Sequence, residues 1–218
     1  MTIDIDGTLT DDSKILSTRG IEALRQVQNR GITVCLISGN VLPITYALHT
    51  YIGLKGPFIS ENGGVIYHDG EVIKLFDITL PKKALEVLKR DMGLQEPFTS
   101  QWRLTEVAVD RRADISRIKE ILRGWKLVIE PTGFAIHVMN IGHGKGTGVK
   151  KVAELLGISA DEIIAFGDSD NDVSMFQYCS TSVAVGNASP SAKAAATYVS
   201  KEEHANGVID GFNHFGLL

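Results

Sequence analysis

The chain has 218 residues, 44% of them hydrophobic, with a formal net charge of −4 at pH 7, and it is long enough for one or two domains with buried cores. The acidic balance provides no basic surface for nucleic acid or for an anionic membrane, so neither is expected as a partner. No apolar run reaches the roughly 18 residues of a membrane-spanning helix.

Short apolar runs alternate with helix-period segments in the first third of the chain, as they do when parallel strands are joined by crossover helices. The first strand has only three residues before Asp4, so either this strand is short or the recorded start lies inside the native chain. The first predicted element is a buried strand with Asp4 and Asp6 at its end. After it we expect a helix at about 18–30 capped by Ser17 or Thr18, an apolar strand at 32–37, and a helix at about 41–52 with Pro43 in its first turn and Gly53 at its end. A strand at FIS, a tight ENGG turn and a hairpin turning at Asp69–Gly70 follow.

The pattern changes near Asp77 and returns to the α/β rhythm at about residue 145. Between these points we expect a small α+β unit with an antiparallel sheet. The fold prediction is therefore a parallel-sheet core made of residues 1–76 and 145–218, with an inserted α+β domain at 77–144. The insert is predicted to hold a helix at 81–92, a strand at about 103–109, a helix begun by Asp114, and strands at 126–130 and 134–139 joined at Pro131–Thr132–Gly133. The second core segment is predicted to hold a helix at about 146–156, the strand EIIAF, a short helix, the strand TSVAV, and a further helix, strand and helix.

Cellular location and cysteine chemistry are predicted from a few residues. The N-terminus has no basic segment followed by an apolar one, so no secretion signal is visible and a cytoplasmic location is expected. Cys35 and Cys179 do not form a CxxC pair, and both are expected to be buried free thiols, with a single disulfide as the open alternative.

Three polar clusters follow near-continuous apolar strands: IDIDGT, SGN and GDSDND. A surface charge pair is the ordinary explanation of any one of them, but in an open parallel sheet ligands bind at the carboxyl ends of the strands, where all three are expected. Strand alternation predicts that Asp4 and Asp6 project the same way, and two such carboxylates repel each other unless a cation is present. Asp168 and Asp172 add further oxygen donors, which Mg²⁺ prefers, and the cluster lacks the Cys and His ligands typical of zinc.

An anion-binding function is indicated by residues outside the carboxylate cluster. Ser38 ends a predicted strand and precedes Gly39 and a helix start, where backbone N–H groups and the helix dipole receive anions. Lys145, between two glycines and just ahead of a helix, can bring a positive charge into the same cleft. Taken singly, SGN is more often a turn and such a lysine more often solvated. Together with the carboxylates they predict a phosphate site in which a free carboxylate can act as nucleophile.

These motifs resemble those of a known family. IDIDGTLT resembles the DxDGT signature of the haloacid dehalogenase (HAD) superfamily of phosphatases, SGN its second motif, Lys145 its third and GDSDND its fourth. The insert lies between the second and third motifs, as in the subclass with an α+β (type C2) cap. The segments LISGN, ENGG, QWR and GFAIHVMN look most like the archaeal-type phosphoglycolate phosphatases, with the sucrose-phosphate and Cof-type phosphatases as near neighbours. The resemblance implies a Rossmann-like, doubly wound parallel-sheet core.

The resemblance also implies roles for individual residues. Asp4 would attack phosphorus and form an aspartyl phosphate, while Asp6 would protonate the leaving alcohol and later activate water. The implied Mg²⁺ ligands are Asp4, the backbone carbonyl of Asp6, and Asp168, with Asp172 among or beside them. The implied phosphate-binding residues are Ser38, Gly39 and Lys145, with Asn171 orienting Lys145 or a carboxylate, Thr8 fixing the first loop, and Gly7 letting backbone approach the phosphate.

Substrate specificity is expected to come from the insert. Candidates to meet a second anionic group, such as a carboxylate, are Trp102, Arg103, Arg111, Arg112 and His137. For each arginine a solvated surface role is the competing interpretation, and for the histidine a half-buried structural one. Glu61 and Asn62 either help to close the site or form a plain hairpin turn, and His143 is expected to be a hinge neighbour without chemistry.

The function expected from these features is Mg²⁺-dependent hydrolysis of a small phosphate monoester, with 2-phosphoglycolate as the leading substrate. A sugar-phosphate phosphatase and a phosphomutase of the same superfamily are the alternatives. A non-catalytic module that binds phosphate esters is disfavoured, because a binder has no need of Asp6. Monomer and homodimer both stay open.

Overall fold

The computed structural model describes all 218 residues, and its largest element is an eight-stranded sheet in the order β11-β10-β9-β1-β2-β3-β4-β5. The strands from β11 to β3 pair in parallel, while β4 and β5 add an antiparallel hairpin at one edge. The strands are β1 (Thr2–Asp4), β2 (Cys35–Ile37), β3 (Phe58–Ser60), β4 (Val65–His68), β5 (Glu71–Lys74), β9 (Ile164–Gly167), β10 (Thr181–Ala184) and β11 (Tyr198–Val199).

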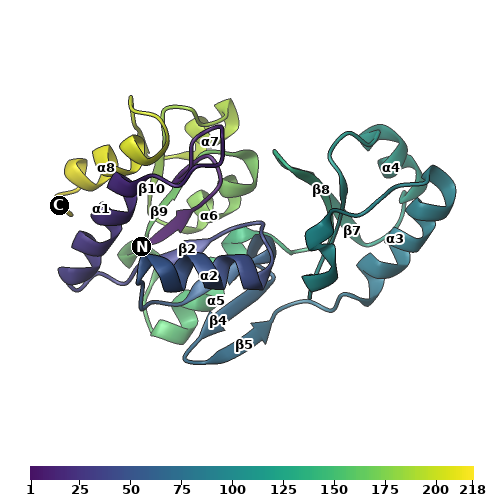
Figure 1. The fold of residues 1–218 in the computed structure, drawn as a ribbon, viewed down its shortest axis with the longest axis horizontal. Helices are drawn as coiled ribbons and strands as arrows, with labels where there is room; N and C mark the ends of the chain where they lie inside the picture. The colour runs from purple at the N-terminus through teal and green to yellow at the C-terminus, as the bar shows by residue number, and fades with distance from the viewer.

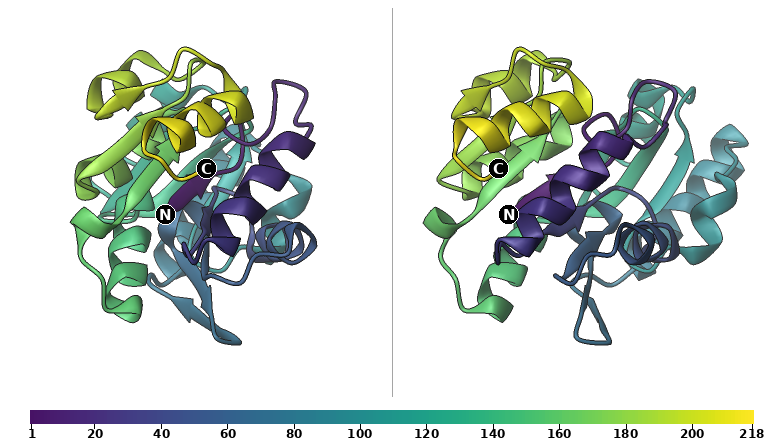
Figure 2. Two further views of the ribbon diagram at one scale, coloured as in Figure 1. Left: turned by 90° about the vertical axis from the view of Figure 1, so that its left-hand side faces the viewer. Right: turned by 60° about the vertical axis from the view of Figure 1, so that its left-hand side comes forward.

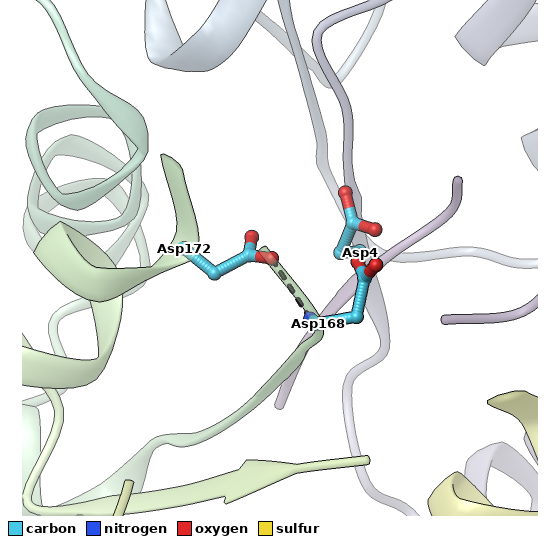
Figure 3. A group of neighbouring side chains, drawn as sticks. All are labelled: Asp4, Asp168 and Asp172. Carbon is cyan, nitrogen blue, oxygen red and sulfur yellow. Dashed lines mark hydrogen bonds between the residues drawn. The ribbon is translucent and has the colours of Figure 1, made fainter. Parts of the chain in front are cut away.

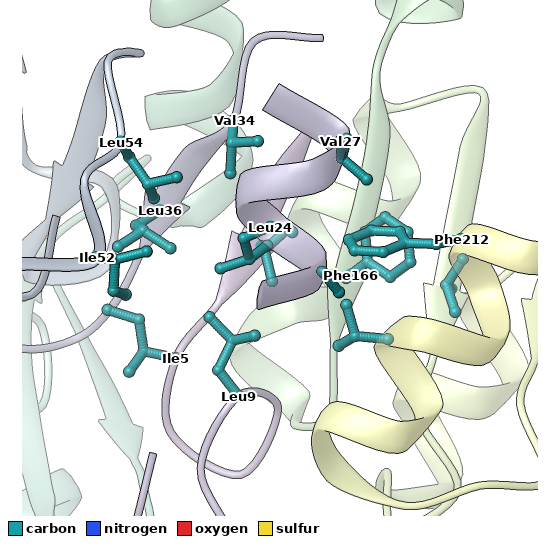
Figure 4. Packing of buried hydrophobic residues seen from close by; sticks show 14 of the residues in the cluster. Ile5, Leu9, Leu24, Val27, Val34, Leu36, Ile52, Leu54, Phe166 and Phe212 are labelled. Atoms are coloured by element: carbon teal, nitrogen blue, oxygen red, sulfur yellow. The ribbon is translucent and has the colours of Figure 1, made fainter. Parts of the chain in front are cut away.

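Helices cover both faces of this sheet (Figures 1 and 2). On one face α1 (Thr18–Asn29), α2 (Leu42–Ile52) and α8 (His204–His214) pack over a core cluster that includes Leu24, Leu36 and Phe212 (Figure 4). On the other face α5 (Lys145–Leu156), α6 (Val173–Tyr178) and α7 (Pro190–Ala195) pack over a second cluster. Successive β2 residues alternate between the two clusters, which explains why the strand is apolar throughout. The fold is a doubly wound α/β fold, as expected.

Local sequence signals place the first helix where it was predicted. The Ser17 side chain accepts a hydrogen bond from the Gly20 N–H at 3.2 Å and caps α1. Ala23, Leu24 and Val27 form its buried stripe. None of the helices in the molecule is long and apolar enough to cross a lipid bilayer.

Both cysteines are free and buried in the cluster beneath α5, α6 and α7. Burial raises the pKa of Cys35 and of Cys179 to about 12 in each case. Each thiol is therefore protonated at neutral pH. The prediction of two buried free thiols is confirmed, since no disulfide joins them.

The segment between β5 and α5 forms a second, smaller α+β unit, which lies to the right of the large sheet in Figure 1. It consists of a three-stranded antiparallel sheet in the order β6-β8-β7, with two helices packed on it around their own apolar cluster. Its elements are α3 (Thr79–Met92), β6 (Val107–Asp110), α4 (Ile115–Ile121, capped by Asp114), β7 (Leu127–Pro131) and β8 (Ala135–Asn140). We call residues 77–144 the cap and the rest of the chain the core. These domain boundaries are the ones predicted from the sequence.

One predicted strand begins later than expected. The strand placed at 103–109 forms only from Val107 to Asp110, and the residues before it are a 3₁₀ helix, Phe98–Trp102, and an irregular connection. The connection contains Arg103, Thr105 and Glu106, which are buried. The Arg103 N–H donates to the Ser100 carbonyl oxygen and the Thr105 N–H to the Glu61 carboxylate, so these backbone donors are not available to a strand ladder. The other 3₁₀ helices are Glu61–Gly63, Ala160–Glu162 and Asp170–Asp172.

Candidate active site

The loops after β1, β2 and β9 meet at the carboxyl edge of the parallel strands, where a cavity of about 410 Å³ opens between core and cap. The core contributes Asp4, Asp6, Gly39, Asp168 and Asn171 to its lining, and the cap contributes Arg111 and residues 132–134. The three polar clusters singled out in the sequence therefore line or adjoin one cavity, as expected of ligand sites in open parallel sheets.

Three carboxylates from two strands gather beside this cavity. Oxygen atoms of Asp4, Asp168 and Asp172 all lie within 4.8 Å of one another (Figure 3). Asp4 is the last residue of β1, Asp168 follows β9, and Asp172 closes the 3₁₀ turn after it. The Asp172 carboxylate accepts hydrogen bonds from the N–H groups of Asp168 and Ser169 at 3.0 and 2.9 Å, which fixes the turn.

Lys145 supplies the positive charge of the cluster. Its Nζ donates to Asp4 Oδ1 and to Asp172 Oδ1, both at 2.6 Å, and the residue is 1% exposed. Burial by itself would lower the pKa of Lys145, but the Asp172 and Asp4 carboxylates outweigh it and hold that pKa above its ordinary value. The lysine is therefore charged.

One ammonium group does not neutralise three carboxylates. Burial raises the pKa of Asp4 well above its usual value; Lys145 opposes this, and the neighbouring Asp172 and Asp168 carboxylates add to it. Burial and the Asp172 carboxylate raise the pKa of Asp168 to about 6. A further cation beside Asp4 and Asp168 would favour the ionised form of both groups.

The donor set fits Mg²⁺. All three groups are carboxylates, and Oδ2 of Asp4 is buried without a hydrogen-bond partner. Gly7 has φ 86°, and a Cβ at this position would collide with the Asp168 carboxylate, so only glycine lets that carboxylate approach the β1 loop. No His or Cys belongs to the group, which disfavours zinc.

Asp6 lies in a different environment from Asp4. Strand β1 ends at Asp4, so strand alternation does not extend to Asp6, and Asp6 is not part of the acidic cluster, although both residues line the cavity. The Asp6 carboxylate accepts a hydrogen bond from Asn40 Nδ2 at 2.7 Å and pairs with Lys14 at 3.1 Å. The two carboxylates therefore have separate partners. Asn40 and Lys14 had not been singled out in the sequence, although Asn40 is the last residue of SGN.

The predicted phosphate-binding residues are also placed at the site. Ser38 is buried; its Oγ accepts a hydrogen bond from the Asn40 N–H at 2.9 Å and lies 3.4 Å from Asp6 Oδ2. Gly39 lines the cavity. Thr8 donates to Asp168 Oδ1 at 3.2 Å, so its side chain holds a carboxylate of another loop, while Thr10 Oγ1 accepts the hydrogen bond from the Gly7 N–H at 3.0 Å within the first loop.

The hydrogen bonds of Asn171 differ from the expectation. Its Nδ2 donates to Asn62 Oδ1 at 3.1 Å, and its Oδ1 accepts from Ser169 Oγ at 2.6 Å. It bonds neither to Lys145 nor to a carboxylate, so the predicted orienting role is wrong. Lys145 is held by Asp4 and Asp172 instead.

Of the five specificity candidates in the cap, only Arg111 lines the cavity. Arg112 is exposed and pairs with Asp110 at 2.7 Å, and Trp102 packs edge-on against Phe98. Arg103 is buried and forms an ion pair with Glu106. His137 is fully buried rather than half-buried, with Nδ1 2.8 Å from Glu106 Oε1.

The ENGG turn and His143 lie where the core meets the cap. Glu61 and Asn62 are buried between core and cap rather than in a plain hairpin turn. His143 is buried, stacks on Phe76 and has Nε2 2.6 Å from the Glu61 carbonyl oxygen. The contacts of this turn with the cap were not visible in the sequence.

Known proteins resemble the chain over nearly its full length. A family model described as haloacid dehalogenase-like hydrolase matches residues 1–101 and 104–212. A protein named phosphoglycolate phosphatase from Thermoplasma volcanium is 37% identical, over 99% of this chain and 97% of the relative. A crystal structure of a Thermoplasma acidophilum protein has a TM-score of 0.94 at 34% identity, covering 100% of this chain and 97% of that one.

A structure titled as a sugar phosphatase of HAD subclass IIB shares the fold, with a TM-score of 0.82 at 22% identity over 100% of this chain and 98% of the other. The family match includes both core segments and nearly all of the cap. The order of the motifs, the doubly wound sheet and the carboxylate cluster at its edge agree with that match. The chain belongs to the haloacid dehalogenase-like hydrolases.

Proposed function

We propose that this hydrolase is a Mg²⁺-dependent phosphatase that converts 2-phosphoglycolate to glycolate and phosphate through an aspartyl phosphate. One observation carries the proposal: Asp4 is held by Lys145 through one oxygen, while its other oxygen is buried beside the cavity without a partner. A carboxylate with a free oxygen next to an ammonium group suits nucleophilic attack on a phosphate ester. The curated relatives named phosphoglycolate phosphatase support the choice of substrate.

In this proposal Asp4 attacks phosphorus, forming a bond between its free oxygen and phosphorus as the bond to the ester oxygen breaks. Asp6 gives its proton to the leaving glycolate oxygen, then takes a proton from the water that hydrolyses the aspartyl phosphate and frees Asp4. Asn40 orients the Asp6 carboxyl from 2.7 Å. The separate partners of Asp4 and Asp6 suit two different roles.

The phosphoryl group would be held by Ser38, the backbone beside Gly39 and Lys145. Asp4, Asp168 and the backbone carbonyl of Asp6 would hold Mg²⁺, with Asp172 beside them. When bound, the ion offsets the negative charge of the phosphoryl oxygens. Because the carboxylates share one ammonium group, the ion also relieves their mutual repulsion.

Arg111 is proposed to recognise the carboxylate of the substrate. It is the cap cation at the cavity, and its only protein hydrogen bond runs from Nη1 to the Gly133 carbonyl oxygen at 2.6 Å. Its other N–H groups are free for a carboxylate, which a guanidinium binds in a fork.

Replacing Arg111 by alanine is expected to lower kcat/KM for phosphoglycolate about 10- to 100-fold, because a hydrogen bond between charged groups contributes roughly 1.5–3 kcal/mol. Hydrolysis of p-nitrophenyl phosphate, which has no carboxylate, should change less than about twofold. Arg112→Ala is the matched control, since this neighbour is exposed and pairs with Asp110 outside the cavity. Equal losses for both substrates, or in both variants, would contradict the assignment.

The function is tested by phosphate release from a panel of esters with Mg²⁺, including phosphoglycolate and several sugar phosphates. Selective release from phosphoglycolate, abolished by EDTA and restored by Mg²⁺, is the expected result. Preference for sugar phosphates would favour the sugar-phosphatase alternative, and dependence on a bisphosphate activator would favour a phosphomutase. Ester binding without release would indicate a binding module.

A further inference from the structure

The segment Glu61–Gly64, which we call the hub loop, has an unusual backbone. Glu61, Asn62 and Gly63 have φ angles of 51°, 52° and 98°, so three consecutive residues lie in the left-handed region. Two of them are not glycine, and such residues adopt this conformation at a cost in conformational energy. All three are buried. Strained backbone of this kind persists only where the surrounding contacts hold it in place, and it occurs most often at active sites and ligand-binding sites.

The hub loop contacts three of the core segments that form the site. The Glu61 N–H donates to the Asn40 carbonyl oxygen at 2.9 Å, and the Asn62 N–H donates to the Ser38 carbonyl oxygen at 3.1 Å. The Asn62 side chain accepts the hydrogen bond from Asn171, in the loop that carries Asp168 and Asp172.

The third segment is the start of α5, which carries Lys145. A Cβ at Gly63 would collide with the carbonyl group of Gly144, so the two backbones are in direct contact. The hub loop therefore touches the second, third and fourth sequence motifs at once.

The same loop contacts the cap. The Glu61 carboxylate accepts hydrogen bonds from the Leu104 N–H at 2.9 Å and from the N–H and Oγ1 of Thr105, each at 2.8 Å. Asn62 Nδ2 donates to Glu106 Oε2 at 3.0 Å. Because these groups are buried, the contacts hold the cap in one position relative to the core.

The polar contacts continue through the cap to the cavity. Glu106 Oε1 accepts from His137 Nδ1 at 2.8 Å, and His137 Nε2 lies 3.2 Å from Thr132 Oγ1. Thr132 lines the cavity from the cap side. A continuous chain of buried side chains therefore joins the cap wall of the cavity to Asn62.

We propose that Asn62 is a positioning residue. It couples the position of the cap to the position of the Asn171 loop, and so to the carboxylates of Asp168 and Asp172 that the phosphatase mechanism uses. Its amide bonds to both sides, through Nδ2 to the cap and through Oδ1 to the Asn171 loop of the core. Arg103 also bridges Glu106 and the core, but its core partner is the Gly39 carbonyl oxygen and not the Asn171 loop. The inference rests on the proposed phosphatase function for its kinetic readout. A purely structural role would change the melting temperature alone.

The direct test is Asn62→Gly. Glycine adopts the left-handed backbone without strain, so the variant removes the side-chain bridge while keeping the loop conformation. We expect kcat for phosphoglycolate to fall at least about tenfold while KM changes less than about threefold. Asp69→Gly is the matched control, because Asp69 also has a left-handed φ, 48°, but lies exposed at the tip of the β4–β5 hairpin. It should leave kcat unchanged.

A double-mutant cycle tests the coupling itself. His137→Gln should lower kcat in the wild-type background, since it breaks the cap side of the chain. In the Asn62→Gly background it should lower kcat by much less, because the bridge from Glu106 to the Asn171 loop is already removed, while the contacts of Glu61 and Arg103 between cap and core remain in both backgrounds. Additive effects of the two substitutions on kcat would overturn the proposal.

Hydrogen exchange provides a readout that does not depend on activity. In Asn62→Gly the peptide covering residues 168–173 should exchange faster than in the wild type, and in Asp69→Gly it should not. A wild-type protein that releases no phosphate would refute the proposed function, and the exchange result would then decide the coupling by itself. A lowered melting temperature with unchanged kcat and unchanged exchange would overturn the coupling.

Discussion

Replacing Asp4 by asparagine is expected to reduce turnover by about 10⁴-fold or more, as removal of a nucleophile does in other covalent mechanisms. The amide keeps the size and shape of the carboxyl group but cannot attack phosphorus. Phosphate release from phosphoglycolate is the measurement. An active Asp4→Asn protein would refute the covalent mechanism.

The folded state should tolerate this change, which makes the loss interpretable. Asparagine removes one of three crowded carboxylates, and Lys145 keeps its ion pair with Asp172 at 2.6 Å. Without metal, the melting temperature should therefore stay the same or rise slightly. A large fall would mean that the ion pair between Asp4 and Lys145 contributes more than the repulsion it offsets.

The Asp6→Asn variant separates proton transfer from metal binding. Turnover should again be crippled, because the variant cannot transfer the proton to the leaving alcohol. Metal binding measured by calorimetry should persist, since the Asp6 side chain bonds to Asn40 and Lys14 and lies outside the acidic cluster. Loss of metal binding in this variant would count against the ligand assignment.

Lys145→Met is expected to reduce both activity and stability. It leaves Asp4, Asp168 and Asp172 with no buried cation, and breaking a buried ion pair by removing one partner costs about 3–5 kcal/mol. The free energy of unfolding, measured by urea denaturation without metal, should fall by that order. Added Mg²⁺ should recover part of the loss, because an ion that binds only the native cluster stabilises it.

The control for this variant is Lys151→Met on the same helix. Lys151 is only partly buried and pairs with Glu154 at 3.1 Å, and exposed pairs contribute about 0–1 kcal/mol. Its stability and turnover should stay close to those of the wild type. If Lys145→Met were equally stable, the ion pairs of Lys145 with Asp4 and Asp172 would contribute nothing to the stability of the metal-free protein, which would contradict this prediction.

Much of the fold could be predicted from the sequence because its signals are local. Ser17 caps α1, Gly53 ends α2, and Asp69–Gly70 turns the β4–β5 hairpin, each through hydrogen bonds or backbone preferences within a few residues. The gathering of Asp4, Asp168, Asp172 and Lys145 was also predictable. Parallel strands place the residues that follow them at one edge, and the motifs stand in the required order. A cytoplasmic location and the oligomeric state stay predictions.

Contacts between the two domains could not be predicted in this way. Asn62 meets Asn171 across 109 positions of sequence and Glu106 across 44, and nothing local to either residue indicates its partner. Arg103 was expected to contact substrate or solvent and His137 to contact substrate or be half-buried, and Glu106 had no local signal, because charged side chains are usually exposed. Their burial depends on how the cap docks against the core.

The sequence by itself therefore determined the fold class, the order of the elements and the chemical groups at the sheet edge, since these follow from backbone periodicity and strand direction. Only the tertiary structure decided that Asp6 is set apart from the acidic cluster, that Arg111 is the cap cation at the cavity, and that the hub loop joins the cap to the site. These features depend on how the cap, with its own sheet and apolar cluster, docks against the core. That position is set by many weak contacts acting together, and none of them leaves a periodic signal in the chain.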